Sequence, residues 1–364
     1  MASKKYQLKK LKKKIFKNNK KEKQRMMKNL CIGSIGAVSA VNVLALTGIF
    51  MPKKSKDNQE LSSQVLAQCK DKEKRKRVKQ VSINAHDGLG LRATVFEAEN
   101  PKGLVQIVHG ALEHKARYYP LMKFLSSNGY TAIISDNRGH GYSINKDNPL
   151  GYMNGMDQMI DDIHRVSLYI KGENPGLELN MIGHSLGSML ARDYLQDYDH
   201  EIQKLIISGT PTFHPFTSLG IHLGKILMVY LGPNNHSRIF NNIKSGRDWL
   251  THNKANIKRA EEDPLMFSSY PNIAGYTIWE INWNLKQYKK YKLQNPKLKI
   301  LNIVGEDDQA ITGGEEGIED TIHSLETIGY RDIESIEYPN MKHEIFNENN
   351  KITVYKDVLR FLNA

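Results

Sequence analysis

Residues 178–187 of this 364-residue chain read Glu-Leu-Asn-Met-Ile-Gly-His-Ser-Leu-Gly, and this stretch decides the fold. An apolar run at 178–182 leads into a Gly-x-Ser-x-Gly motif centred on Ser185, and a segment of helical period follows at 186–196. A strand, a sharp turn and a helix in this order are typical of a nucleophile elbow, whose glycines leave room for a strained serine. The stretch therefore predicts that Ser185 is a nucleophile at the end of a buried strand.

The chain after Lys79 repeats this alternation of short apolar runs and helical segments. Seven further runs are expected as strands: 81–85, 91–98, 104–108, 130–135, 204–207, 300–304 and 333–338. The first two of these flank a His-Asp-Gly turn and look like a hairpin. Buried strands alternating with helices predict an α/β fold with a mostly parallel, eight-stranded sheet covered by helices on both faces. Because ligands of such sheets bind beyond the carboxyl ends of the strands, functional residues are expected there.

Two later strands end in groups that could activate a serine. In a sheet of this kind the chain order is serine, then acid, then histidine. His343 is the only histidine after the last expected strand, so we expect it to be the general base. The strand at 300–304 is followed by Glu306, Asp307 and Asp308, one of which would orient the imidazole.

The loop after the strand at 104–108 is the expected position of an oxyanion hole. A backbone N–H from this loop, together with the N–H of Leu186, would bind the negative oxygen of the reaction intermediate. The loop begins with His109, and His140 lies in a second Gly-rich loop. We expect both histidines to brace these loops rather than to carry protons.

The net charge of +13 belongs to the N-terminal part of the chain. Residues 1–79 hold 23 Lys and Arg against 5 Asp and Glu, whereas residues 80–364 hold 29 against 34. A basic nucleic-acid-binding face on the main domain is therefore not expected. Cys31 and Cys69 are the only cysteines, so the main domain has neither a thiolate nucleophile nor a Cys-based zinc site.

The N-terminal part predicts a membrane anchor. Residues 1–28 form a basic arm, and 29–52 carry no charge and are long enough to cross a bilayer as a helix. The arm is expected to stay cytoplasmic by the positive-inside rule, which sends the main domain outside the cytoplasm. A cleaved signal sequence is the alternative. Residues 53–79 are expected as a basic linker, with the main domain at 80–364.

Several motifs together resemble the α/β-hydrolase superfamily, and within it the serine aminopeptidase-like (S33) branch that contains monoacylglycerol lipases and bacterial lysophospholipases. The matching stretches are His109-Gly110-Ala111-Leu112-Glu113-His114 with Arg117-Tyr118, Asp136-Asn137-Arg138-Gly139-His140-Gly141-Tyr142-Ser143, Gly183-His184-Ser185-Leu186-Gly187, Glu262-Asp263-Pro264-Leu265 and Lys342-His343-Glu344. The resemblance implies that Asp308 is the triad acid, with Asp307 in reserve, and that Ala111 and Leu186 supply the oxyanion donors. It also implies a helical cap at about 212–294 and no metal or organic cofactor.

The resemblance implies a serine hydrolase that cleaves small lipid esters, either monoacylglycerols or lysophospholipids. The cap holds all three tryptophans and a largely apolar stretch at 219–231, which either packs the cap onto the core or lines an acyl pocket and faces a membrane. Leu112 is a departure, because lipases of the monoacylglycerol type often carry a second glycine there. The alternatives are an acyltransferase or a peptidase with the same triad, or an inactive membrane-bound binding protein.

Overall fold

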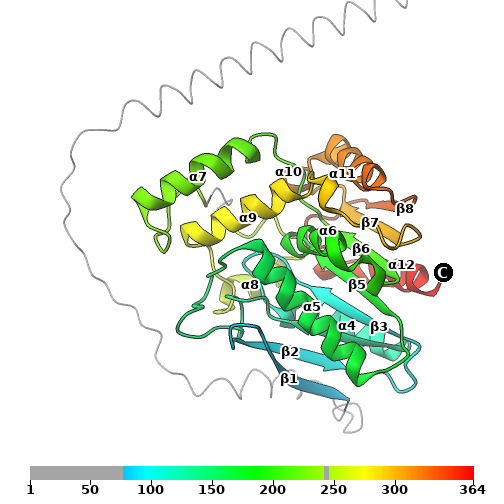
Figure 1. Cartoon of the computed structure of the whole chain (residues 1–364). Helices are drawn as coiled ribbons and strands as arrows, with labels where there is room; N and C mark the ends of the chain where they lie inside the picture. The colour runs from blue at the N-terminus through cyan, green and yellow to red at the C-terminus, as the bar shows by residue number, and fades with distance from the viewer. Residues whose placement is uncertain (1–76, 242–245) are drawn as a thin grey trace, which may run out of the picture. The chain divides into compact units, whose positions relative to one another are not determined.

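A twisted sheet with helices on both faces forms the centre of the protein (Figure 1). The computed structural model describes residues 77–241 and 246–364. The strands are β1 (Val78–Asn84), β2 (Gly90–Phe96), β3 (Gly103–Val108), β4 (Tyr130–Ser135), β5 (Leu179–His184), β6 (Lys204–Ser208), β7 (Lys299–Gly305) and β8 (Asp332–Tyr338). Their order in the sheet is β1-β2-β4-β3-β5-β6-β7-β8.

The pairing confirms the expected mostly parallel sheet of eight strands. The hairpin of β1 and β2 is antiparallel, and β2 also pairs antiparallel with β4. Every other neighbouring pair is parallel, from β4 and β3 through to β7 and β8. The carboxyl ends of β3, β5, β6, β7 and β8 therefore lie along one edge of the sheet, where the chemistry was expected.

Helices cover the two faces of the sheet and form two apolar cores (Figure 1). The helices are α4 (Tyr119–Ser127), α5 (Met156–Glu173), α6 (Leu186–Tyr198), α7 (Thr217–Leu231), α8 (Lys254–Glu262), α9 (Asn272–Asn284), α10 (Gln309–Thr312), α11 (Gly314–Ile328) and α12 (Lys351–Asn363). Short 3₁₀ helices lie at η2 (Lys115–Tyr118), η3 (Asp199–Glu201), η4 (Tyr288–Lys290) and η5 (Ile345–Asn347). Buried side chains of α5, α6 and α11 share one core, and those of α4 and α12 share the other.

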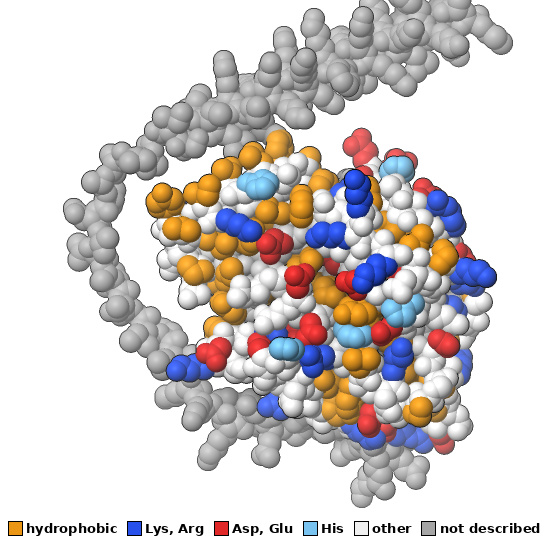
Figure 2. Space-filling model, in the orientation of Figure 1, with side chains coloured by type: hydrophobic (Ala, Val, Ile, Leu, Met, Phe, Trp, Pro, Cys, Tyr) orange, Lys and Arg blue, Asp and Glu red, His pale blue; other side chains and the backbone are white. Residues whose placement is uncertain are grey.

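The chain between β6 and β7 contains the expected cap region, with α7, α8 and α9. Helix α7 packs on α9, which also contacts α5 and α6. Two glycines of α7 face α9: a Cβ on Gly220 would lie 3.2 Å from the Trp279 ring, and one on Gly224 would lie 2.8 Å from the Tyr276 ring. Large apolar side chains of α7 point away from the protein instead, and Figure 2 shows hydrophobic side chains gathered over this helix.

Several strand boundaries differ from the sequence expectation by one to three residues, and the differences in β5 and β1 bear on the site and on the domain boundary. The expected strand at 178–182 extends to His184, because Gly183 and His184 continue the parallel pairing with Ile207 and Ser208 of β6. Strand β1 begins at Val78, since Val78 and Lys79 already pair with the end of β2. The last residues of the segment 53–79, which was expected as linker, therefore belong to the sheet.

The predicted basic arm at 1–28, the membrane helix or signal sequence at 29–52 and most of the linker lie outside the described residues. Within 77–241 and 246–364, no helix combines the length and the apolar character that a membrane crossing requires.

Gly187 allows α6 to approach β3, and its replacement is expected to destabilise the fold. A Cβ at this position would lie 2.1 Å from the carbonyl oxygen of Val108, so Gly187→Ala must push the helix away from the sheet. We expect a loss of about 3 kcal/mol or more in the free energy of unfolding, measured by denaturant titration.

Gly172→Ala is the matched control, because Gly172 lies in α5 and its Cβ would meet no atom within 4 Å. Alanine has the higher helix propensity, so this variant should gain up to about 1 kcal/mol. Equal stability of the two variants would contradict the close approach of α6 and β3.

Candidate active site

Ser185 lies in a left-handed turn between β5 and α6. Its backbone angles are φ 52° and ψ −120°, a conformation that residues other than glycine rarely adopt. Its amide donates to the carbonyl oxygen of Ser208 at 2.9 Å, which fixes the turn to β6. A Cβ on Gly183 would lie 2.4 Å from the carbonyl oxygen of Gly187, so the turn closes only with glycine there. The motif thus forms the strained strand–turn–helix that its sequence predicts.

Asp308 and His343 meet beyond the ends of β7 and β8. The Oδ2 atom of Asp308 lies 2.7 Å from Nδ1 of His343, and both residues are almost fully buried. The neighbouring Asp307 turns away and contacts Nε2 of His252 at 2.6 Å, on the protein surface. Glu306 is exposed. Of the three consecutive carboxylates, Asp308 is therefore the one that contacts the imidazole.

Two aromatic rings pack against the imidazole of His343. The ring of His184, at the end of β5, lies 4.7 Å away between centroids, and the indole of Trp249 lies 5.2 Å away. Gly209 follows β6, and a Cβ there would lie 3.0 Å from Nδ1 of His343. Because His184 directly precedes Ser185, these contacts bring the imidazole to the elbow.

The electrostatic surroundings favour a proton on His343. Burial alone lowers the pKa of a histidine, because it destabilises the charged form. The charge and the hydrogen bond of Asp308, with the charges of Glu344 and Glu113, outweigh burial, so the pKa of His343 is raised above 6.5. Burial and the neighbouring His343 hold the pKa of His184 well below 6.5. Of two imidazoles in contact, one is suited to accept a proton and the other stays neutral.

The loop after β3 lies against Ser185 and contains the expected donor Ala111. The amide of Gly110 donates to Oε1 of Glu113 at 2.6 Å, and the amide of Leu112 donates to the hydroxyl of Tyr270 at 2.9 Å. The amide of Ala111 lies between these two occupied amides. A Cβ on Gly110 would be 3.1 Å from Cβ of Ser185, which shows how closely the loop approaches the elbow.

Leu186 is the second residue expected to offer an amide. It is the first residue of α6, so its N–H has no acceptor within the helix. The positive end of the helix dipole lies at the same place and favours negative charge there. The two expected oxyanion donors, Ala111 and Leu186, thus belong to segments that flank Ser185.

His109 and His140 brace loops through both ring nitrogens. Nε2 of His109 accepts from the amide of Asn137 at 2.8 Å, and its Nδ1 lies 2.8 Å from the carbonyl oxygen of Gly110. Nδ1 of His140 lies 3.0 Å from the carbonyl oxygen of Arg138. Burial lowers the pKa of His109 to about 3 and that of His140 to about 4, so both are neutral at physiological pH. These contacts agree with the bracing role expected for both.

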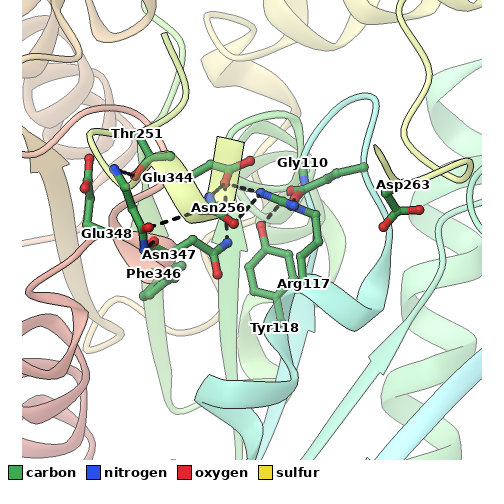
Figure 3. A network of polar contacts seen from close by, with 12 residues as sticks. Gly110, Arg117, Tyr118, Thr251, Asn256, Asp263, Glu344, Phe346, Asn347 and Glu348 are labelled. Atoms are coloured by element: carbon green, nitrogen blue, oxygen red, sulfur yellow. Dashed lines mark hydrogen bonds and ion pairs between the residues drawn. The ribbon is translucent and has the colours of Figure 1, made fainter. Parts of the chain in front are cut away.

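A buried ionic network adjoins the site (Figure 3). Arg117 forms ion pairs with Glu113 and with Glu344, the residue after His343. Nδ2 of Asn256, on the cap helix α8, donates to Glu344 at 2.8 Å, and the hydroxyl of Tyr118 donates to Glu113 at 2.7 Å. Burial and the charge of Glu344 raise the pKa of Glu113. The network joins the loop after β3, the loop of His343 and the cap.

The sequence pointed to the three cap tryptophans as a group, but it did not predict which cap residues touch this site. Trp249, Asn256 and Tyr270 belong to no motif, and they reach the loops of His343, Glu344 and Leu112 only through the fold. Glu113, Arg117 and Glu344 did lie in the motifs, but nothing in their spacing indicated that they pair with one another.

An elbow serine after β5, a histidine–carboxylate pair after β8 and β7, and a helical insertion between β6 and β7 define an α/β hydrolase. The chain belongs to the family described as "Serine aminopeptidase, S33", whose model matches residues 99–350. Because this family was inferred from the motifs, the resemblance is confirmed.

Similar proteins include lipases, phospholipases and esterases. A monoacylglycerol lipase of Mycolicibacterium smegmatis is 23% identical over 265 residues, which cover 72% of this chain and 89% of that protein. Phospholipase YtpA of Bacillus subtilis is 26% identical over 133 residues, or 36% of this chain and 48% of that protein. The crystal structure of a carboxyl esterase from Bacillus coagulans superposes with a TM-score of 0.70 at 24% identity, over 79% of this chain and 98% of that one. The chain is a lipase/esterase-type α/β hydrolase.

The His343–Asp308 contact predicts how three histidines titrate. His343 should titrate above pH 6.5, whereas His109 and His140 should stay neutral down to about pH 5. Asp308→Asn removes the charge that favours the imidazolium, so the pKa of His343 should fall. NMR titration of the imidazole signals measures these values.

Asp307→Asn is the control, because Asp307 contacts His252 and not His343. It should leave the titration of His343 unchanged. A fall in the pKa of His343 in this variant, with none in Asp308→Asn, would instead assign Asp307 as the partner.

Proposed function

We propose that this protein is a serine hydrolase that cleaves carboxylic esters of small lipids, monoacylglycerols or lysophospholipids. The observation that carries the proposal is the buried hydrogen bond between Asp308 and His343 beside the strained turn of Ser185. The names of the similar proteins support a lipid ester as the substrate.

The first half of the reaction transfers the acyl group to Ser185. His343 takes the proton of the Ser185 hydroxyl through Nε2 as the oxygen attacks the ester carbonyl. The amides of Ala111 and Leu186 bind the oxygen that becomes negative. The tetrahedral intermediate then collapses, and the leaving alcohol takes the proton from His343.

The second half releases the acid. Water replaces the alcohol, gives a proton to His343 and attacks the carbonyl of the acyl-enzyme. The second tetrahedral intermediate then collapses: the bond to Ser185 breaks, and the serine oxygen takes the proton back from His343. Asp308 holds Nδ1 of His343 protonated and stabilises the imidazolium formed in both halves. The raised pKa of His343 fits a base that must keep the proton until the intermediate collapses.

The exposed face of α7 supports action at a lipid surface. Leu219, Leu223, Ile226 and Tyr230 follow one another at helical spacing, and with Val229 they are 47 to 82% exposed. The same helix turns its glycines toward α9. A helix with large apolar residues in solvent and small ones inside is suited to lie in a bilayer interface. We propose that this face docks on membrane lipid (Figure 2).

The composition of the N-terminal segment is also consistent with action at a membrane. Residues 29–52 are proposed to anchor the chain in a membrane, with the hydrolase domain outside the cytoplasm. An anchored enzyme meets lipid esters at a high local concentration.

Two other kinds of function are compatible with the same residues. An acyltransferase or a peptidase would share the triad, and product analysis with an added alcohol or amine acceptor separates them from an esterase. An inactive binding protein would fail to react with a fluorophosphonate, which labels activated serines. The intact set of Ser185, His343 and Asp308 favours an active enzyme.

Ser185→Ala should abolish activity and labelling while the protein stays folded. We expect kcat for a long-chain ester to fall at least about 10⁴-fold, because no other group replaces the nucleophile. Ester hydrolysis and fluorophosphonate labelling measure the effect. Ser126→Ala, which changes a serine of α4 whose hydroxyl contacts only its own helix, should remain active. Normal turnover by Ser185→Ala would refute the assignment.

Substitutions on α7 should weaken action on lipid aggregates but not on soluble esters. Val229→Asp removes apolar surface that would enter the interface, so the rate on monoacylglycerol in mixed micelles should fall about tenfold. The rate on a short soluble ester should not change, and the wild type should prefer long-chain esters to acetyl esters.

Leu168→Asp is the control for this experiment, because Leu168 is 51% exposed on α5 and lies outside the cap. It should leave the ratio of micellar to soluble rates unchanged. An equal fall for both variants, or a preference of the wild type for acetyl esters, would count against docking through α7.

A further inference from the structure

A buried tyrosine of the cap contacts the loop that carries Ala111. The hydroxyl of Tyr270 accepts a hydrogen bond from the amide of Leu112 at 2.9 Å and lies 2.7 Å from Nε2 of His140. Tyr270 is fully buried, so water does not compete for these bonds. Neither the catalytic steps nor the motifs account for this tyrosine.

The protonation of His140 decides which group donates in each of these hydrogen bonds. Its pKa is about 4, so the ring is neutral and carries one proton. Nδ1 lies 3.0 Å from the carbonyl oxygen of Arg138, which can only accept, so the proton is on Nδ1. Nε2 must therefore accept from the Tyr270 hydroxyl, and the hydroxyl oxygen is left to accept from Leu112.

Leu112 needs such an anchor because its backbone is strained. Its φ of 62° lies in the left-handed region, which costs a leucine about 1 kcal/mol or more. The hydrogen bond from the Leu112 amide to Tyr270 holds this strained residue, and Ala111 directly precedes it in the loop. On the other side of Ala111, the amide of Gly110 donates a hydrogen bond to the carboxylate of Glu113, which fixes that end of the loop.

Tyr270 is itself held rigidly. Its amide donates to Oδ1 of Asn241 at 2.6 Å, and Nδ2 of Asn241 donates to its carbonyl oxygen at 2.8 Å. Its ring packs edge-on against Phe267 and His140, with centroid distances of 5.1 and 5.7 Å. A rigid hydroxyl can transmit the position of the cap to the loop after β3.

We propose that Tyr270 is a positioning residue for the oxyanion hole: its hydroxyl, directed by neutral His140, fixes the Leu112 amide and thereby aims the N–H of Ala111. The inference rests on the proposed function, in which that N–H binds the oxyanion. If Tyr270 has this role, the oxyanion hole is complete only when the cap is packed so that Tyr270 contacts the loop after β3.

Tyr270→Phe tests this inference, because it removes the hydroxyl and keeps the ring. We expect kcat for an ester to fall 10- to 100-fold with KM within about twofold of wild type, since the hole acts on the transition state. Affinity for a trifluoromethyl ketone, whose adduct places an oxygen in the hole, should fall in parallel with kcat. Amide hydrogen exchange at 110–112 should also become faster.

Tyr130→Phe is the matched control. Tyr130 is also buried, and its hydroxyl donates to the carbonyl oxygen of Leu362 at 2.7 Å, at the opposite end of the sheet. It should lose similar stability but keep kcat, inhibitor affinity and exchange at 110–112. Equal effects of the two variants on kcat, or a change in KM alone for Tyr270→Phe, would overturn the inference.

Failure of the proposed function gives a different result. A wild-type protein that neither reacts with fluorophosphonate nor hydrolyses esters would refute both proposals together. A reactive wild type with an unchanged kcat in Tyr270→Phe would refute only the role of Tyr270.

Discussion

The site depends on one buried hydrogen bond, between Oδ2 of Asp308 and Nδ1 of His343. Burying either group alone would be costly, and a nearby opposite charge is what makes a buried carboxylate tolerable. The bond places the proton on Nδ1, so Nε2 can act as the proton acceptor that the proposed mechanism assigns to it. Glu113 and Glu344 add negative charge nearby, and Arg117 between them limits their mutual repulsion. The ionic network therefore supports the proton affinity of His343 from beyond its direct partner.

Ser185 with φ 52° and Leu112 with φ 62° are non-glycine residues of the site in the left-handed backbone region. Such strain persists only where the surrounding structure holds it. The turn of Ser185 is held by the glycines beside it and by the carbonyl of Ser208, all within the sheet and α6. The turn of Leu112 is held instead by Tyr270 from the cap. A glycine at this position would adopt the same φ without strain and would need the anchor less.

The cap has two faces with different chemistry. Toward the core it supplies Trp249 against His343 and Asn256 to the ionic network, so it forms part of the site. Toward solvent, α7 presents apolar side chains such as Val229 and Tyr230 that the core does not need. Small residues on the inner face of α7 allow close packing on α9, which leaves the larger ones outside. One insertion between β6 and β7 thus supplies side chains to the site and an exposed apolar face.

The sequence by itself determined the sheet, the elbow and the edge at which the functional residues gather, because apolar runs and glycine spacing are local properties. It could not choose among Glu306, Asp307 and Asp308 from their residue types, since the backbone after β7 decides which side chain points inward. It also gave no sign of Tyr270, which meets Leu112 across 158 residues of chain. The tertiary structure alone decided these contacts, because they depend on the paths of loops and of the cap, which have no periodic pattern.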